Sequence, residues 1–474
     1  MTASIFWYDF ETTGVQAHSD RPIQVAGIRT NEQLEEIDEP LNMYCQLSDD
    51  ILPHPMSSLV TGIGPDVLQQ QGLLEVDFIE RLHQELIRPN TCTAGFNSIR
   101  FDDEMTRATL YRNFYDPYAR EWQGGNSRWD LIDVLRCTWA LRPEGIEWPE
   151  QDGVMSFRLE KFTAVNGIEH GQAHDALADV RATIAVARLL RERQPKLFNY
   201  LYDLRRKDAV MERIRLLQPM LHVSGMFSVA RHCLSPVLPL AWHPTNRNAL
   251  IVCDLHADVT PLLELDAQAL KERLYTPRVE LAEGESPVPL KLIHINKSPV
   301  VAPLGVLREE DNMRLNFDHQ RWQDNYHVLK DQCEQWRDKL SFVYEESWAG
   351  GEQDVEQQLY SGFLAPRDRK LCEALRNTAP EKLLPEFWPF DDERLAELLF
   401  RYRGRNYPHT LSENELHQWA LFCRARLTGE HSGAPLNIAD YLNAYAALTP
   451  EQQLDPIVQA WRHHVHEIEQ RYQL

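Results

Sequence analysis

The stretch SIFWYDFETTG, residues 4–14, constrains the fold of this chain more than any other segment. It is an apolar, aromatic run that ends in Asp9 and Glu11 and continues into a Thr-Thr-Gly sequence typical of a turn. In a β-strand, side chains alternate between faces, so Asp9 and Glu11 lie on one face while Tyr8 and Phe10 lie on the other. Neighbouring carboxylates repel each other unless a cation lies between them, usually a divalent metal that takes oxygen ligands.

The position of the acidic pair in the chain is what makes it evidence for a site. With 71 acidic residues among 474, chance alone gives roughly ten acidic-x-acidic triplets. This triplet stands where a predicted first strand ends and a turn begins, and side chains at such a point are held by a buried strand. The sequence therefore predicts an acidic site at the end of the first strand.

The composition bounds the class of protein. A chain of 474 residues is long enough for two to four domains with ample core, and 43% hydrophobic with 25% charged residues is typical of a soluble globular protein. The eight cysteines are dispersed without a CxxC pair, which excludes zinc ribbons and a disulfide framework and indicates a reducing cytoplasm. No export signal and no membrane-spanning apolar run is found, so we expect a cytoplasmic protein that does not contact a membrane.

The net charge of −22 argues against nucleic-acid binding over the whole surface, because phosphate contacts normally leave a basic footprint. A deep channel with its own cations and aromatic side chains can still hold a single strand inside an acidic body.

The pattern along the chain predicts three domains, at residues 1–195, 196–348 and 351–474. The first alternates strand-like and helix-like segments, including a helix-like run over 66–88 and a long amphipathic segment over 174–193, which indicates an α/β domain with a mixed sheet. The second has short strand-like runs between Pro, Gly and Asn turns and reads as a small β-rich module. The third has helical periodicity.

Two further acidic signals follow in the first domain. Asn97 precedes Phe101 and Asp102, on what should be the opening of a helix, and His174 precedes Asp179 in a late helical segment. Each signal alone has an ordinary explanation, because acidic residues favour helix N-terminal turns and solvated helix faces. Taken in this order, the three signals bring carboxylates and one imidazole into a single α/β domain.

These three motifs, D-x-E, N-x3-F-D and H-x4-D, resemble those of the DEDDh 3′→5′ exonuclease superfamily over roughly the first 190 residues. Beyond them, the segments NFYDPYAREWQGGNSRWDLIDVLR, ALRPEGIEWPE, SFRLEKFTAVNGIEH, HVSGMF and PLAWHPTNRNA resemble the bacterial exodeoxyribonuclease I family along essentially the whole chain. The resemblance implies a ribonuclease H-like exonuclease domain, an SH3-like β domain and a helical C-terminal domain, which form a C-shaped body around single-stranded DNA.

The resemblance also implies the chemistry. Two divalent ions, Mg²⁺ with Mn²⁺ as a substitute, would stabilise charge on the attacking water and on the leaving 3′ oxygen of a phosphodiester. We expect Asp9, Glu11 and Asp179 as direct metal ligands, and Asp102 as a ligand of the second ion, directly or through water. His174 would be the general base, because imidazole titrates near neutrality. Glu11 also lies near the 3′-hydroxyl in the family, so the expected product is a 5′-mononucleotide released from the 3′ end.

The expected single-stranded DNA contacts combine cations, aromatic rings and polar groups. They are Arg107, Tyr118, Trp122, Arg136, Arg158, Asn248, Lys291, His294 and Asn296. For Arg158 an ordinary surface ion pair is an equal alternative, Tyr118 and Trp122 are equally compatible with a core position, and the middle-domain residues with an ordinary barrel surface.

One partner and two alternative functions complete the hypotheses. The family binds the acidic C-terminal tail of single-stranded DNA-binding protein, and a basic ridge for it is expected near Arg308, Arg314 and Arg321, which are otherwise solvated helix charges. We expect a monomer. The alternatives are an RNA 3′-end-trimming exoribonuclease, whose short relatives lack the last 280 or so residues, and a non-catalytic single-strand-binding scaffold, in which an unused cluster of like charges would cost stability.

Overall fold

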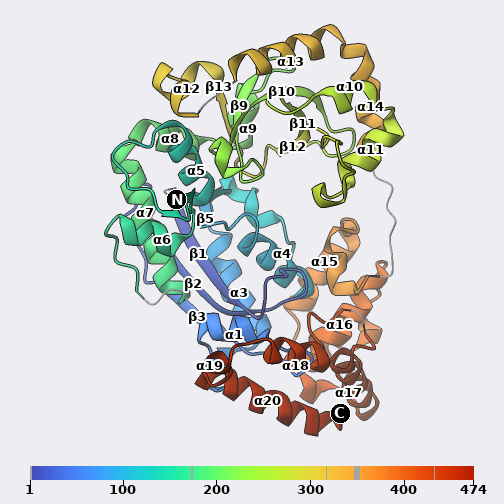
Figure 1. The fold of residues 1–474 in the computed structure, drawn as a ribbon. Helices are drawn as coiled ribbons and strands as arrows, with labels where there is room; N and C mark the ends of the chain where they lie inside the picture. The colour runs from blue at the N-terminus through green and yellow to red at the C-terminus, as the bar shows by residue number, and fades with distance from the viewer. Residues whose placement is uncertain (1–2, 172–174, 316–317, 346–352, 432) are drawn as a thin grey trace. The chain divides into compact units, whose positions relative to one another are not determined.

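The chain forms two compact units in the computed structural model, which describes residues 3–171, 175–315, 318–345, 353–431 and 433–474. Unit 1 comprises residues 1–127, 170–184 and 350–474, and unit 2 comprises residues 128–169 and 185–349 (Figure 1). Strand β6 (Ser127–Asp130) and helix α7 (Ala176–Arg193) both extend across the boundary between the units. The exonuclease-like sheet and the C-terminal helices therefore share unit 1.

Unit 1 contains a mixed sheet, as predicted. Its strands run in the order β4-β3-β2-β1-β5. Their bounds are β1 Ser4–Thr12, β2 Pro22–Thr30, β3 Leu41–Cys45, β4 Gly72–Leu73 and β5 Thr91–Gly95. β1 pairs antiparallel with β2 and parallel with β5, and β3 pairs antiparallel with β2 and parallel with β4. The central strand β1 is thus bordered on both sides, which fixes the direction of each of its side chains.

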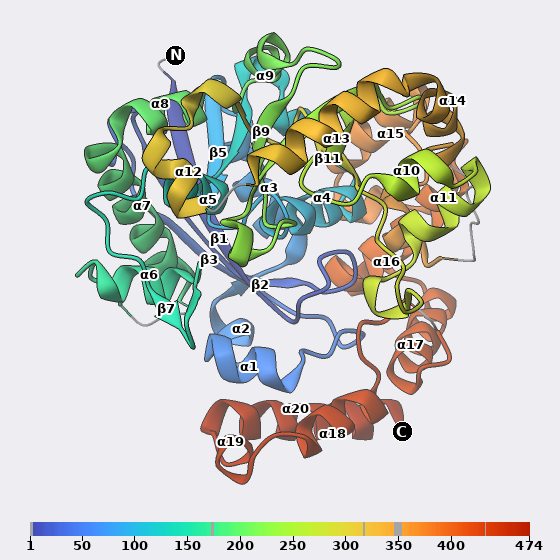
Figure 2. The same cartoon turned by 45° about the horizontal axis from the view of Figure 1, so that its top comes forward.

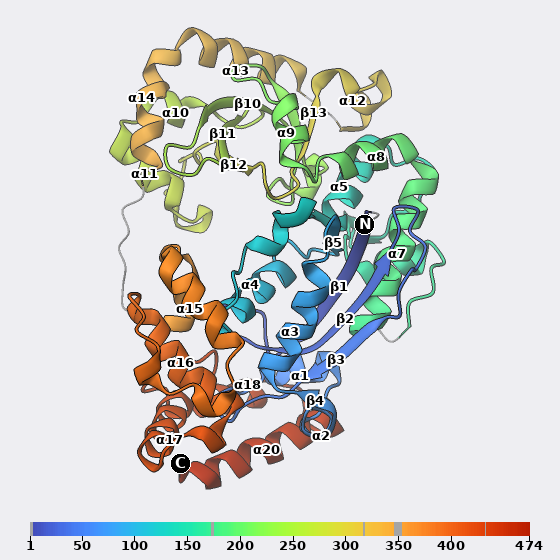
Figure 3. The ribbon, with the colours of Figure 1, turned by 180° about the vertical axis from the view of Figure 1, so that it is seen from behind.

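Helices α3 (Glu75–Leu86) and α4 (Asp102–Arg112) cover one face of this sheet (Figure 3). The core on that face includes Phe6, Tyr8 and Phe10 of β1 together with residues of both helices. The alternation expected for the first strand is confirmed, because Asp9 and Glu11 occupy the intervening positions. One close approach depends on glycine: a Cβ at Gly27 would lie 2.3 Å from the Phe6 ring.

The helix-like run over 66–88 is interrupted in the structure. Helix α2 (Pro65–Gln71) ends at Gly72, β4 follows, and α3 starts at Glu75. A Cβ on Gly72 would lie 2.3 Å from the Leu68 carbonyl oxygen, so this position needs glycine for the tight exit from α2. Periodicity alone did not reveal the break, because the apolar positions keep helical spacing across it.

The C-terminal helices pack on the exonuclease part of unit 1. Their bounds are α15 Pro366–Arg376, α16 Glu393–Asn406, α17 Glu413–Thr428, α18 Ile438–Ala446, α19 Pro450–Gln453 and α20 Pro456–Tyr472. Helix α1 (Pro55–Thr61) lies beside α18 and α20, as Figure 2 also shows. Trp461 of α20 donates its indole N–H to the Ile63 carbonyl at 2.8 Å and packs with Ile23 and Leu68.

Unit 2 is built on an antiparallel sheet of strand order β12-β11-β10-β9-β13. The bounds are β9 Met220–Val223, β10 Leu234–Trp242, β11 Ala249–Asp254, β12 Leu290–His294 and β13 Val300–Pro303. The remaining elements are α5 Leu131–Leu141, β7 Glu150–Gln151, β8 Val154–Met155, α6 Leu159–Val165, α8 Pro195–Asp203, α9 Lys207–Arg213, α10 Thr260–Glu264, α11 Ala267–Tyr275, α12 Glu309–Leu315, α13 His319–Asp331 and α14 Cys333–Val343. These five strands all lie within residues 196–348, for which the sequence pattern predicts a β-rich module.

That module is more helical than its sequence suggested. Leu329 of α13 and Trp336 of α14 are buried against strand residues such as Ile251 and Leu238. These helices carry many charged and polar residues, so their mean hydropathy is low and their pattern resembles a solvated segment. Among the residues that the structure describes, no helix has the length and apolar character needed to cross a membrane.

Candidate active site

Three carboxylates converge at the end of β1. Asp9 and Glu11 come from one face of β1, and Asp179 comes from the first turn of α7. One oxygen atom from each lies within 4.8 Å of the others, and within the described residues this is the one His, Cys, Asp or Glu group with that arrangement. The spacing suits a divalent cation with oxygen ligands, and this donor set favours Mg²⁺ or Mn²⁺ over zinc.

Asp102 is tied to the same strand from a different direction. It is the first residue of α4, is 3% exposed, and accepts a hydrogen bond from the Phe10 backbone N–H at 3.1 Å. Phe10 lies between Asp9 and Glu11, so this bond holds the second motif against the first.

Asn97 forms the turn that leads into α4. Its φ is +65°, in the left-handed region that asparagine tolerates better than most residues, and its carbonyl accepts from the Arg100 N–H at 3.2 Å. The left-handed backbone conformation therefore explains why asparagine suits position 97 in the second motif.

Burial and like charges disfavour ionisation of the carboxylates in this cluster. Burial raises the pKa of Asp9 well above its ordinary value, and the charges of Asp102 and Asp179 raise it further. Burial, followed by Asp9, Asp179 and Asp175, raises the pKa of Glu11 to about 9. Like-charged carboxylates in a buried site resist ionisation, and a bound divalent ion reverses that preference.

The predicted general base, His174, lies outside the described residues. A different histidine, His170, is seen at the cluster: its Nε2 lies 2.5 Å from Asp179 Oδ1, and its side chain is 9% exposed. The sequence alone does not reveal the place of His170, because this residue lies in the loop before α7, outside the H-x4-D spacing. Asp175 was missed as well, and its Oδ1 accepts from Gln24 Nε2 at 3.3 Å.

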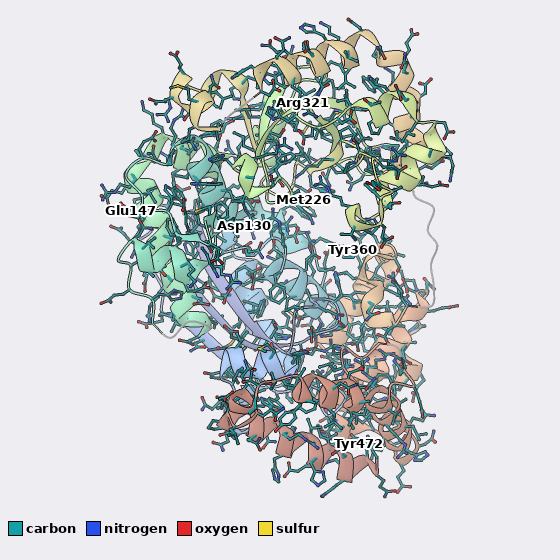
Figure 4. The ribbon with its side chains drawn as sticks, viewed as in Figure 1. Asp130, Glu147, Met226, Arg321, Tyr360 and Tyr472 are labelled. Carbon is teal, nitrogen blue, oxygen red and sulfur yellow. The ribbon has the colours of Figure 1, made fainter. Side chains whose placement is uncertain are left out.

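The predicted DNA contacts of unit 1 gather beside α4. The Arg107 guanidinium is 4% exposed and donates to both carboxylate oxygens of Glu121, at 2.7 and 2.9 Å, and to Glu104 at 2.7 Å. It also donates to the hydroxyl of Tyr360, labelled in Figure 4, and lies 5.4 Å from the Tyr118 ring centroid. Arg107 thus holds Tyr118 in place through interactions within the protein.

Trp122 differs from these buried groups. It is 64% exposed, so the core alternative for this residue is wrong, and its ring is accessible to a ligand. Tyr118 is half-buried and has one ring edge towards Phe363, at a centroid distance of 5.7 Å.

The predicted contacts of unit 2 fall into two groups. Arg158 is exposed at the start of α6, and Arg136 pairs with Asp133 at 2.7 Å near the Phe157 ring. The other group lies where β11 and β12 pair, because the Ile295 N–H donates to the Asn248 carbonyl at 2.8 Å.

This second group includes Asn248, Lys291, His294 and Asn296. The Asn248 side chain accepts from Lys207 at 2.7 Å, and Lys291 donates to Ser224 at 2.5 Å. Burial, helped by Lys297 and His243, lowers the pKa of His294 to about 4, so this imidazole is neutral at pH 7. Asn296 is exposed. The pairing brings Asn248, His294 and Asn296 to one end of the two strands.

The fold and the site define a class. A mixed sheet with Asp9, Glu11 and Asp179 converging at the end of its central strand belongs to a metal-dependent exonuclease, and the family model described as Exonuclease matches residues 6–187. The chain is therefore a hydrolytic exonuclease.

Two further family models specify the family. The Exonuclease I SH3-like domain matches residues 205–346, and the Exonuclease I C-terminal domain matches residues 353–468. The chain is 47% identical to exodeoxyribonuclease I of Escherichia coli over 432 residues and 46% identical to that of Haemophilus influenzae over 429 residues, with 90% of each chain covered.

Solved structures give the same result. Exonuclease I from Methylocaldum szegediense aligns with a TM-score of 0.92 at 46% identity, covering 98% of this chain and 99% of that one. E. coli exonuclease I in complex with a dA16 oligonucleotide aligns with a TM-score of 0.93 at 44% identity, covering 98% and 100%. The chain belongs to the exonuclease I family, and the predicted fold class is confirmed.

Proposed function

We propose that the chain hydrolyses single-stranded DNA with two Mg²⁺ ions, which Mn²⁺ can replace, held by Asp9, Glu11, Asp102 and Asp179. As a member of the exonuclease I family, it is a single-strand-specific 3′→5′ exonuclease that depends on a divalent metal. The observation that supports the proposed ligand set is the convergence of Asp9, Glu11 and Asp179 within 4.8 Å in a buried site.

Each side chain has a separate task in this proposal. The metal ions, when bound, supply Lewis-acid stabilisation and an acidified water. Asp9, Glu11 and Asp179 would be direct metal ligands, and Asp102, which accepts a hydrogen bond from the Phe10 N–H, would hold the second ion directly or through water. His174 accepts the proton of the attacking water, and Glu11 orients the terminal 3′-hydroxyl. His170 holds Asp179 in one orientation through the 2.5 Å contact.

The surroundings of Tyr118 support a grip on single strands. A cavity of about 300 Å³ is lined by aromatic and apolar side chains, among them Tyr118, Phe363 and Leu364, together with Arg369 and Arg376. Aromatic faces and cations are the groups that bind bases and backbone without regard to sequence. Further proposed DNA contacts are Trp122 in unit 1 and, in unit 2, Arg136, Arg158, Asn248, Lys291, His294 and Asn296.

An end-labelling experiment tests the function. With Mg²⁺, a single-stranded DNA oligonucleotide labelled at its 3′ end should lose its label at once as a 5′-mononucleotide, while a 5′ label should be released last. EDTA should stop both reactions, and an RNA of the same sequence and a blunt duplex should stay intact. Early release of the 5′ label would overturn the polarity, and equal digestion of RNA would favour the exoribonuclease alternative.

We further propose that unit 2 binds the acidic C-terminal tail of single-stranded DNA-binding protein. Arg308 is one-third exposed and pairs with Asp311 and Glu144, and Arg314 donates to the Trp139 carbonyl at 3.2 Å. Neighbouring side chains line a cavity of about 140 Å³, composed of Leu221, Pro236, Leu304, Leu307, Asn312, His319 and Trp322. A basic rim beside an apolar hollow fits an acidic peptide with an apolar end.

Arg321 is the best residue for testing this tail site, because it is exposed and precedes Trp322 of the cavity. Arg321→Glu should weaken binding of a fluorescent tail peptide at least about 10-fold, as a reversed rim charge adds repulsion. Arg337→Glu changes another exposed arginine, on α14, and should bind the peptide as the unaltered protein does. Equal affinity of both variants would refute this placement of the tail.

A further inference from the structure

A buried polar network lies directly beneath the proposed metal site. Asp103 follows Asp102 in α4, but its carboxylate points to different partners: Oδ1 accepts from the Tyr8 hydroxyl at 2.7 Å and from Arg120 Nη2 at 2.7 Å. All three residues are almost fully excluded from solvent, with Tyr8 and Arg120 each 1% and Asp103 2% exposed. No metal ligand is among them, and the proposed hydrolysis does not use them.

The network joins the two segments that carry the metal ligands. Tyr8 directly precedes Asp9 on β1, and Asp103 directly follows Asp102 at the start of α4. The Tyr8–Asp103 hydrogen bond therefore links the neighbours of two ligands, in parallel with the Phe10 N–H bond to Asp102.

Further bonds stiffen this link. The Asp103 N–H donates to the Ser98 carbonyl at 2.9 Å, and Thr106 Oγ1 donates to the Asp102 carbonyl at 2.7 Å. The positive charge of Arg120 compensates the negative charge of Asp103 in a site without water access.

We propose that Tyr8, Asp103 and Arg120 are positioning residues that set the distance of Asp102 from Asp9 and thereby the affinity for the second metal ion. The inference rests on the proposed two-metal function. Mutation of groups that orient metal ligands without touching the metal typically lowers metal affinity or activity by about 10- to 100-fold. A buried ion pair by itself adds little net stability compared with apolar packing, so a positioning role explains its presence better than a stabilising one.

Tyr8→Phe tests the proposal with the smallest change. It removes only the hydroxyl and keeps the ring in its core, so the protein should fold. Mn²⁺ binding, measured by calorimetry and by the loss of the free-ion electron paramagnetic resonance signal, should show the weaker of two sites at least about 10-fold weaker, with the tighter site unchanged. The turnover number should fall at low Mn²⁺ and recover at high Mn²⁺, while KM for DNA stays constant.

Tyr200→Phe is the matched control. Tyr200 belongs to unit 2 and loses a hydrogen bond of the same length, 2.7 Å to the Val301 carbonyl. Its Mn²⁺ isotherm should equal that of the unaltered protein. Asp103→Asn is a second variant, which should weaken Mn²⁺ binding at the same site further. If Asp103→Asn does not fold, the result for Tyr8→Phe alone tests the proposal.

The outcomes separate the inference from the function on which it rests. If the unaltered protein binds two Mn²⁺ ions and Tyr8→Phe binds both equally well, the positioning role is refuted and the two-metal function stands. If the unaltered protein binds fewer than two ions, the two-metal function itself fails.

Discussion

Asp9→Asn is expected to lower the turnover number for single-stranded DNA by roughly 10³-fold or more, because it removes a charge from the group that holds the metal ions. Asp9, Glu11 and Asp179 each supply one oxygen atom to the converging cluster, so no neighbouring carboxylate can replace Asp9 without leaving its own position. The asparagine side chain has nearly the same shape. The loss therefore reports on charge and ligand quality and not on packing.

The thermal stability of Asp9→Asn should be unchanged or higher, although its turnover number falls. Burial and the neighbouring carboxylates raise the pKa of Asp9 well above normal, which means that the ionised form is unfavourable in the metal-free protein. Asparagine cannot ionise, so Asp9→Asn in EDTA should melt at the same temperature as the unaltered protein or higher. A stability gain together with an activity loss is the signature of a site kept for function.

The measurement is Mg²⁺-dependent release of mononucleotides, with binding of the same oligonucleotide in EDTA measured by anisotropy. Asp66→Asn serves as the control, since Asp66 is exposed at the start of α2 in the same unit. It should retain full activity. Asp9→Asn should bind DNA at least as tightly as the unaltered protein, and a variant that keeps its turnover would refute the ligand assignment.

The first strand and its acids could be predicted from the sequence because they depend on local rules. An apolar run followed by a turn gives a strand, alternation gives the faces, and Asp9 with Glu11 on one face gives the site. The three motifs could then be recognised from their order along the chain and from the residue spacing within each motif. Each motif uses residues close together in the chain, and the resemblance to the DEDDh superfamily joined the three motifs into one site.

The features that escaped prediction depend on tertiary contacts that the periodicity of the sequence does not encode. Arg107 was interpreted as a cation for the DNA backbone, but Glu104, Glu121 and Tyr360 engage it in the structure, and the last of these is 253 residues away. The role of His170 next to Asp179 depends on a loop conformation that no periodicity encodes. The Asp103–Arg120 pair was invisible for the same reason, because a charged residue in a sequence reads as exposed unless its partner is known.

A cluster of buried ion pairs joining the C-terminal helices to the exonuclease part of unit 1 was equally hidden. Glu356 is 4% exposed and pairs with Arg21, with Arg405 at 2.5 Å and with Arg401 at 3.6 Å. Arg405 also reaches Asp50 at 2.8 Å. Arg21 and Asp50 belong to the N-terminal part of the chain, so the cluster connects segments that are more than 300 residues apart.

Glu356→Gln is expected to destabilise the protein by about 3–5 kcal/mol, because it leaves several buried arginines without their shared carboxylate. The free energy of unfolding, measured with urea at pH 7, tests this. Glu397→Gln is the matched control: Glu397 pairs with the same Arg401 at 2.9 Å but is 42% exposed, so its loss should cost less than about 1 kcal/mol. Equal effects of the two substitutions would contradict the structural role of the buried cluster.

The pH dependence of the unfolding free energy tests the role of Glu356 independently. Burial alone would raise the pKa of Glu356, but Arg405 and Arg21 outweigh it and hold the pKa well below normal. A carboxyl whose folded pKa is depressed stabilises the fold above its unfolded pKa, about 4.3 for glutamate, and loses that contribution as the pH falls towards the folded value. The stability difference between the unaltered protein and Glu356→Gln should therefore be full at pH 7 and shrink below about pH 4. A difference that grew on acidification would mean that Glu356 is protonated in the folded protein, contrary to its position among arginines.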